Sequence, residues 1–183
     1  MTESSFAPAL LLSMPQMHDP NFAQTVVLLC EHNEDGAFGL VINRPLTTTA
    51  KVVSQDEPED AQEHELEVWI GGPVEPERSW ILLHDEGADE RAIRICDGVF
   101  LSTSASVLKR IIDRSADPRT RLVAGYAGWG PGQLDAEIAA SAWLSMGVAV
   151  DLVFDTPAGE MWTAAIRRLG ASPGTLQTGQ GVH

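Results

Sequence analysis

The chain has 183 residues, of which 44% are hydrophobic and 21% charged, and this ordinary globular composition excludes a wholly disordered protein. Its 26 acidic residues against 12 basic ones give a formal net charge of −14, and residues 51–100 alone hold fourteen Asp and Glu against four Lys and Arg. Because such a field repels the phosphates of a duplex, the composition disfavours direct DNA binding.

The two ends of the chain show no membrane or export signal. Residues 1–9 lack a basic region, and the apolar run 9–12 is too short for a signal peptide or a membrane span. The end of the chain, residues 172–183, has no large apolar side chain after Leu176 and is expected to be loosely held. We therefore expect a cytoplasmic protein of one domain, residues 1–183, with a core over about residues 8–170.

The first half of the chain is predicted to be mostly strands. After the apolar run 9–12, residues 25–30 and 38–42 form strand-like runs around a turn with Asn33 and Gly36, which predicts a β-hairpin. Pro45 removes a backbone donor, so the second strand is expected to end before it.

Three further short runs and one acidic segment follow. Residues 67–70, 80–84 and 92–100 are predicted to be strands of the same sheet system. The acidic residues 54–67 have no apolar period and are predicted to form an exposed loop or a solvated helix face.

The second half mixes helices with strands, which indicates an α+β fold. Apolar residues at helical spacing after Ser104 predict a helix near 104–115, and residues 121–126 predict a strand. A second helix is expected to begin at Pro131 and to carry Leu134, Ile138 and Trp143 along one side. A strand over 148–154 and a helix from Pro157 to Gly170 complete the prediction.

The least ordinary segment is Gly125–Gln133, which holds four glycines and two large aromatic residues in nine positions. It is predicted to join a strand to a helix. One interpretation is a ligand loop, in which glycines permit close approach and free amides at the helix start attract an anion. The favoured interpretation is a tight crossover in which Tyr126 and Trp129 fill the core.

Few residues suggest catalysis or metal binding. Cys30 and Cys96 are isolated and are expected to be buried, reduced thiols rather than a redox pair. His18 and Asp19 are adjacent, and a loop or capping role for Asp19 is favoured over an acid-base pair. No local motif predicts a nucleophile, a metal or a cofactor. The other histidines considered are expected at the surface or at strand ends: His32, His64 and His84.

The basic residues are concentrated in one region, which is interpreted as a solvated helix face and, if nucleic acid or an acidic partner binds, as its contact surface. These residues are Lys109, Arg110, Arg114, Arg119 and Arg121.

Several separated motifs together resemble the AlgH/YqgE family of bacterial proteins. In chain order they are Met14-Pro15, Asp19-Pro20-Asn21-Phe22, Gly39-Leu40-Val41-Ile42-Asn43-Arg44-Pro45, Gly71-Gly72-Pro73-Val74, Gly125-Tyr126-Ala127-Gly128-Trp129, Gly132-Gln133-Leu134, Trp162 and Leu169-Gly170. The resemblance implies an α+β fold whose mixed sheet curls into a partial barrel with about three main helices packed on it. The resemblance also brings one family label, that of a transcriptional regulator tied to alginate production. It implies no catalytic residue and no cofactor.

The favoured function is a non-enzymatic protein that binds a small molecule or a partner protein and regulates, if at all, indirectly. Polar residues at strand ends beside glycine turns favour this interpretation. Two alternatives stay open, a hydrolase whose residues meet only in the fold and a transcriptional regulator that contacts DNA directly. The predicted binding residues are Asn43, Arg44, Tyr126, Trp129, Gly130 and Gln133.

Overall fold

The computed structural model describes residues 5–17, 19–20, 22–52, 62–113 and 115–170. The strands are β1 (Ala9–Ser13), β2 (Val26–Asn33), β3 (Gly36–Val41), β4 (Pro45–Val52), β5 (Gln62–Ile70), β6 (Val74–Leu83), β7 (Ile93–Cys96), β8 (Val99–Ser102), β9 (Arg121–Trp129) and β10 (Trp143–Met146). The helices are α1 (Ala105–Ile112), α2 (Gln133–Ala139), α3 (Val150–Phe154) and α4 (Ala158–Arg168), with a short 3-10 turn, η1 (Glu86–Ala88).

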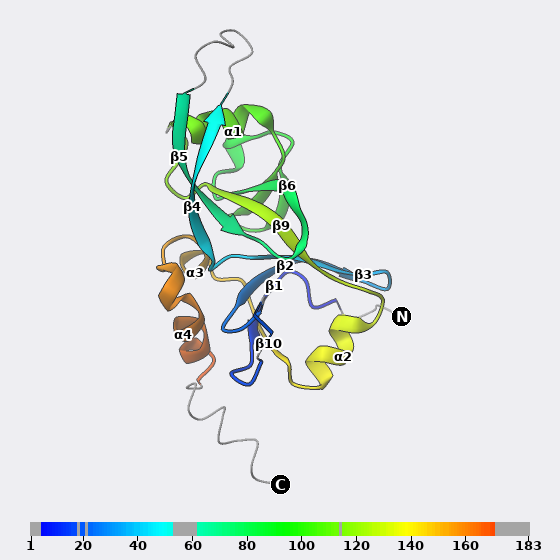
Figure 1. Ribbon diagram of the computed structural model, residues 1–183. Helices are drawn as coiled ribbons and strands as arrows, with labels where there is room; N and C mark the ends of the chain where they lie inside the picture. The colour runs from blue at the N-terminus through cyan, green and yellow to red at the C-terminus, as the bar shows by residue number, and fades with distance from the viewer. Residues whose placement is uncertain (1–4, 18, 21, 53–61, 114, 171–183) are drawn as a thin grey trace.

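The ten strands form one mixed sheet that curls into a half-barrel, as the family resemblance implies. The main strand order is β10-β1-β2-β3-β9-β6-β8-β7, and the β4–β5 hairpin joins it through β9. In Figure 1, β4, β5, β6 and α1 occupy the upper part of the molecule, and β1, β10, α2, α3 and α4 occupy the lower part. Strand β9 crosses between the two parts, so it ties them together.

Strand β9 changes neighbours at Gly125. Its first half pairs in parallel with β5, Leu122–Ala124 facing Val68–Ile70, whereas its second half pairs antiparallel with β3. Gly125 has φ +76°, a left-handed conformation that glycine adopts at low cost. The backbone of Gly71 connects β9 to β3 next to this point. Its N–H donates to Ala124 O at 2.8 Å, and its carbonyl accepts from Val41 N at 2.8 Å.

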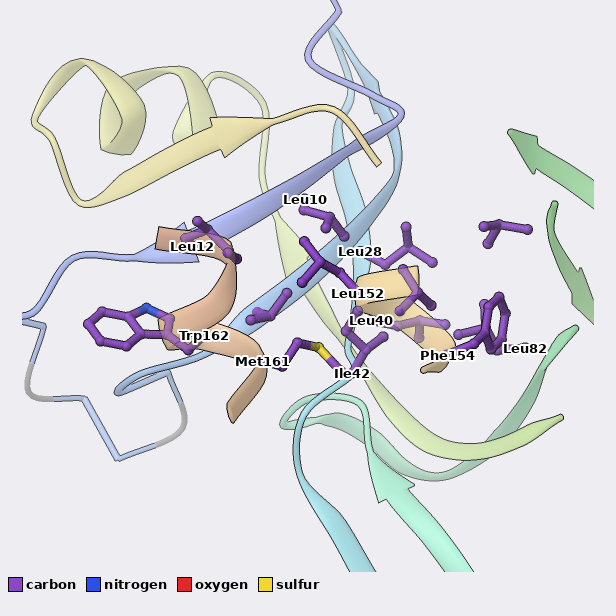
Figure 2. Close-up of a cluster of buried hydrophobic side chains, with 14 of the residues drawn as sticks. Leu10, Leu12, Leu28, Leu40, Ile42, Leu82, Leu152, Phe154, Met161 and Trp162 are labelled. Atoms are coloured by element: carbon purple, nitrogen blue, oxygen red, sulfur yellow. The ribbon is translucent and has the colours of Figure 1, made fainter. Parts of the chain in front are cut away.

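The largest core cluster lies between the lower strands and the last two helices (Figure 2). Leu10 and Leu28 are wholly buried on adjacent strands, and Leu152 of α3 packs into the same cluster. Helix α4 presents Met161 and Trp162 to this cluster, and the Trp162 Nε1–H donates to Ser13 O at 2.9 Å. Burial of these apolar side chains holds α3 and α4 against the sheet.

Several predicted elements are confirmed. The hairpin is β2–β3, with Gly36 at φ +137° in its turn. The first long helix is α1, which begins after Ser104, and the last is α4, which is followed by Gly170 at φ +79°. In each case the local signal, a turn glycine or an amphipathic spacing between caps, agreed with the tertiary environment.

Predictions in the first half were wrong where the sequence indicated one strand and the structure has two. Pro45 does follow the end of β3, but it also begins β4, which the prediction omitted. Residues 92–100 form the hairpin β7–β8 rather than one strand, because Asp97 and Gly98 make a turn with Gly98 at φ +80°. Within the predicted acidic loop or helix face, residues 62–67 belong to strand β5, and residues 54–61 lie outside the described residues.

Two predictions in the second half were also wrong. Residues 150–154 form helix α3 and not a strand, because a short apolar run has no periodicity that separates the two. The second helix ends at Ala139, and Trp143 begins β10 after a turn with Ser141 at φ +60°. The described part of the structure has α1, α2 and α4 as its three longer helices, in agreement with the predicted three or so main helices, and the five-residue α3 is additional.

Two predictions concern a loosely held tail and the lack of a membrane span. The tail from residue 172 lies outside the described residues. No helix in the described ranges is long and apolar enough to cross a membrane.

Candidate functional site

The predicted binding residues Asn43 and Arg44 make internal contacts. Asn43 Oδ1 accepts from Val26 N at 3.1 Å, and its Nδ2 donates to Gln24 O at 3.0 Å. Arg44 Nη2 donates to Ala23 O at 3.0 Å and to the Thr25 hydroxyl at 2.9 Å. Burial lowers the pKa of Arg44, with Asp19 acting in the opposite direction. The two side chains clamp the β1–β2 connection to the β3–β4 connection.

This clamp gives a stability prediction. Asn43→Ala is expected to lower the free energy of unfolding by about 1–3 kcal/mol, because the Val26 N–H loses its acceptor next to the core. Asn33→Ala is the matched control, since Asn33 makes similar hydrogen bonds at the exposed hairpin tip. It is expected to cost less than about 0.5 kcal/mol. Urea titration measures both, and equal losses would show that the clamp is unimportant.

The predicted ligand segment is mostly strand and core. Strand β9 continues to Trp129, so the crossover to α2 comprises only residues 130–132. Trp129 is 6% exposed and meets Trp143 edge-on, with ring centroids 6.0 Å apart. Tyr126 packs on Phe38, and the centroids of the two rings are 5.1 Å apart. The Gly130 N–H donates to Gln133 Oε1 at 3.0 Å, so the predicted open amide already has an acceptor.

A groove of about 430 Å³ lies elsewhere, where the base of the β4–β5 hairpin and the start of β9 face the α3–α4 connection. Pockets that bind small ligands measure about 300–1,000 Å³, so the volume is sufficient for one. Four separated chain segments form its walls. The walls include Pro45, Glu67, Trp69, Arg121, Asp155 and Met161.

Arg121 and Trp69 form the rigid centre of the groove. The Arg121 guanidinium carbon lies 4.9 Å from the centre of the Trp69 ring, a cation–π contact. Arg121 Nη2 also donates to Phe154 O at 2.8 Å, and its Nη1 to Pro118 O at 2.5 Å. These bonds to backbone carbonyls fix the guanidinium between β9 and α3. Burial lowers the pKa of Arg121. Nearby carboxylates oppose this shift, and Glu67 has the largest effect among them.

The carboxylates of the groove differ in their surroundings. Asp155 receives two hydrogen bonds from Arg119, from Nε at 3.0 Å and from Nη2 at 3.1 Å, which is a bidentate ion pair. Glu67 is exposed on β5, where its cross-strand neighbour on β4 is the uncharged Thr47. Of these two carboxylates, Glu67 is therefore the exposed one that has no bidentate ion pair with an arginine.

Among the residues considered for catalysis, the two cysteines have thiols with raised pKa values. Burial raises the pKa of the Cys30 thiol to about 12, with smaller contributions from Cys96 and Glu31, so Cys30 stays protonated and unreactive at neutral pH. Burial raises the pKa of Cys96 as well. Both are free thiols, half-buried rather than fully buried as predicted. His18 lies outside the described residues.

The other histidines have structural partners or lie where the structure does not describe their side chains. His32 Nδ1 accepts from Phe6 N at 3.0 Å, and its Nε2 lies 3.1 Å from Asp135 Oδ2, which joins β2 to α2. His84 follows β6, a strand end as predicted, and its Nδ1 lies 2.8 Å from Gly98 O. The side chain of His64, on β5, is not described. Within the described ranges, no three His, Cys, Asp or Glu side chains gather as a metal site would require.

Of the basic residues predicted as a solvated helix face, Lys109 and Arg110 are exposed in the last turn of α1. Arg110 donates to Ala88 O, and Arg119 and Arg121 make the contacts described above. Arg114 lies outside the described residues. Arg121 was predicted as one of the basic residues of a solvated face, and Trp69 and Glu67 were not predicted as binding residues. Both reach the groove only because β5 pairs with β9. The one available signal was a tryptophan in a half-buried strand next to a glycine turn.

Comparison with known proteins gives matches over nearly the whole chain. A sequence model of the AlgH-like family matches residues 10–174. A UPF0301 protein of Myxococcus xanthus is 40% identical over 181 residues, which cover 98% of this chain and 99% of that protein. The solution structure of the AlgH protein from Pseudomonas aeruginosa is similar with a TM-score of 0.74 at 37% identity, and the match covers 100% of both chains.

A more distant structure shows the same fold. A crystal structure of a protein from Corynebacterium diphtheriae is similar with a TM-score of 0.65 at 22% identity, covering 91% of this chain and 88% of that one. At this identity the similarity concerns the fold alone.

Proposed function

Since this chain belongs to the AlgH-like family, whose matched relatives bear names that state no activity, we propose that it is a non-enzymatic protein that binds its ligand in the groove between β5, β9 and α4. One observation carries the proposal. The Trp69 ring and the Arg121 guanidinium are held against each other, because Arg121 is bonded to the carbonyls of Phe154 and Pro118. A preformed site loses less conformational entropy on binding.

The predicted residues Asn43 and Arg44 stabilise one wall of the groove. They hold the connection that leads into β4, and Pro45, the first residue of β4, lies on the groove wall. Trp129 and Gln133 stabilise the β9–α2 crossover, so we assign them to the scaffold. The ligand contacts then fall to Trp69, whose ring combines apolar area with little conformational freedom.

The proposal is of binding and not of catalysis. A protonated Cys30 is no nucleophile, and in the groove the Asp155 carboxylate is held by Arg119. Any regulatory effect would then pass through the bound ligand or partner rather than through DNA, because the net charge of −14 repels a duplex. We place the protein in the cytoplasm on the ground that both cysteines are free thiols.

A fragment screen by NMR on the isotope-labelled protein tests the proposal. Fragments that perturb the Trp69 indole N–H are expected to bind at least about tenfold more weakly to Ala158→Trp, which fills the groove from the first turn of α4. Ala136→Trp places the same side chain on the exposed face of α2 and is expected to leave binding unchanged. Fragments that bind both variants equally, or a screen with no groove shifts, would refute the site.

A further inference from the structure

The groove opens onto one face of the β4–β5 hairpin. Side chains alternate between the two faces of a strand, so Glu65, Glu67 and Trp69 of β5 share this face. In the antiparallel register they lie opposite Thr49, Thr47 and Pro45 of β4. Over residues 45–49 of β4 and 65–69 of β5, the face is therefore uncharged along β4, acidic along β5, and aromatic where it meets the groove.

The exposed charge on this face is negative. Glu65 and Glu67 are both exposed, and the nearby Arg119 is paired with Asp155. The Arg121 guanidinium, bonded to backbone carbonyls under the Trp69 ring, keeps its positive charge near Glu67, but the two exposed carboxylates outnumber this cation. The whole chain carries a net charge of −14, and the acidic excess is greatest over residues 51–100, which include β5. Charge complementarity therefore favours a basic occupant and opposes an anionic one.

The shape of the groove suits a long basic side chain. Trp69, which is half-buried, offers apolar surface on its wall, and Glu67 offers a carboxylate on the same face. Lys and Arg combine an aliphatic stem with a charged end, so one such side chain would use both kinds of surface. A volume of about 430 Å³ holds a few side chains and not a folded domain.

The edge of the sheet beside the groove suits an extended backbone. Strand β4 pairs with β5 and, among the described residues, with no other strand, so its outer edge is open. Residues 45–49 of β4 are exposed, and Leu46 is 53% exposed. An added strand would gain backbone hydrogen bonds along this edge and present alternate side chains to the acidic face.

We propose that this face binds an extended, basic segment of a partner protein, with a Lys or Arg side chain in the groove, its stem against Trp69 and its charge beside Glu67. This inference rests on the proposed function, that the groove is a binding site. It adds the class of partner and the residue that recognises its charge.

The probe is a blocked ten-residue peptide of alternating Arg and Thr, compared with the same peptide carrying Glu for Arg and with spermidine. Binding is followed by calorimetry and by the NMR shift of the Trp69 indole N–H at low and physiological salt. The Arg peptide is expected to saturate the shift and to weaken with salt. Glu67→Gln is expected to weaken it about tenfold, the size of one hydrogen bond to a charged group.

Glu34→Gln is the matched control, because it removes the same charge at the exposed tip of the β2–β3 hairpin and is expected to leave binding unchanged. Equal weakening by both variants would show only a general charge effect and would overturn the proposal. Spermidine that binds as tightly as the peptide, or a Glu peptide that binds more tightly, would overturn it as well.

The fragment screen separates this inference from the proposed function. If fragments bind the groove and are lost in Ala158→Trp but the Arg peptide does not bind, the groove is a binding site for another class of ligand and the basic-segment inference is wrong. If neither fragments nor peptide bind, both proposals are wrong.

Discussion

Gly72→Ala is expected to prevent folding or to lower the free energy of unfolding by more than about 3 kcal/mol. A Cβ on Gly72 would lie 2.2 Å from both the carbonyl carbon and oxygen of Tyr126, and 2.5 Å from Ala127 N. These are backbone atoms of β9, which pairs with β3, β5 and β6 and cannot shift alone. Gly72 also has φ +151°, where a side chain is strained. Chemical denaturation monitored by circular dichroism measures the loss.

Two control substitutions separate the contact from the backbone strain. Gly132 has φ +73°, and a Cβ added there would have no neighbour within 4 Å among the described residues, so Gly132→Ala reports the conformational cost alone, about 1 kcal/mol. Gly159 lies in the first turn of α4 with open space around it, so Gly159→Ala is expected to be neutral or stabilising by up to about 1 kcal/mol. A Gly72→Ala loss no larger than that of Gly132→Ala would refute the close packing of β9.

Trp162→Ala is expected to cost about 3–5 kcal/mol, as for other large aromatic side chains removed from a core. Trp162 is 5% exposed and belongs to the main core cluster beneath α4. Trp162→Phe keeps most of the apolar contact but leaves the carbonyl of the fully buried Ser13 without the indole donor. It is expected to cost about 1–3 kcal/mol. Thermal unfolding by calorimetry gives both values.

Arg167→Ala is the control on the same helix, because Arg167 is exposed in the last turn of α4. A change of less than about 0.5 kcal/mol is expected. If Trp162→Ala cost no more than Arg167→Ala, α4 would not be anchored by its buried face. Since Met161 and Ala158 of α4 line the groove, the Trp162 variants are also expected to lose fragment binding at that site.

The glycine segment shows what family resemblance and geometry each contribute. The sequence places four glycines and two aromatics in residues 125–133, and the family matches bear out that this pattern belongs to an AlgH-like chain. The pattern does not state which glycine bends the strand and which permits close packing. Gly125 does the first and, across the sheet, Gly72 does the second, because β9 passes from β5 to β3 at that point.

The sequence by itself determined the α+β class, the β2–β3 hairpin, and helices α1 and α4. In each of these, a turn glycine or a run at helical spacing acts over a few neighbouring residues. It also determined the acidic balance that disfavours DNA binding. It did not determine α3, a five-residue helix whose buried residues Leu152, Val153 and Phe154 are consecutive and so give no amphipathic period.

Only the tertiary structure decided where a ligand could bind. Glu67 and Trp69 are about fifty residues from Arg121 and further still from Met161, and no local pattern connects them. Parallel pairing of β5 with β9 brings the first three together, and packing of α4 against the sheet supplies the fourth. Such pairings depend on the summed packing of the whole core, which is why the groove is absent from the sequence and present in the fold.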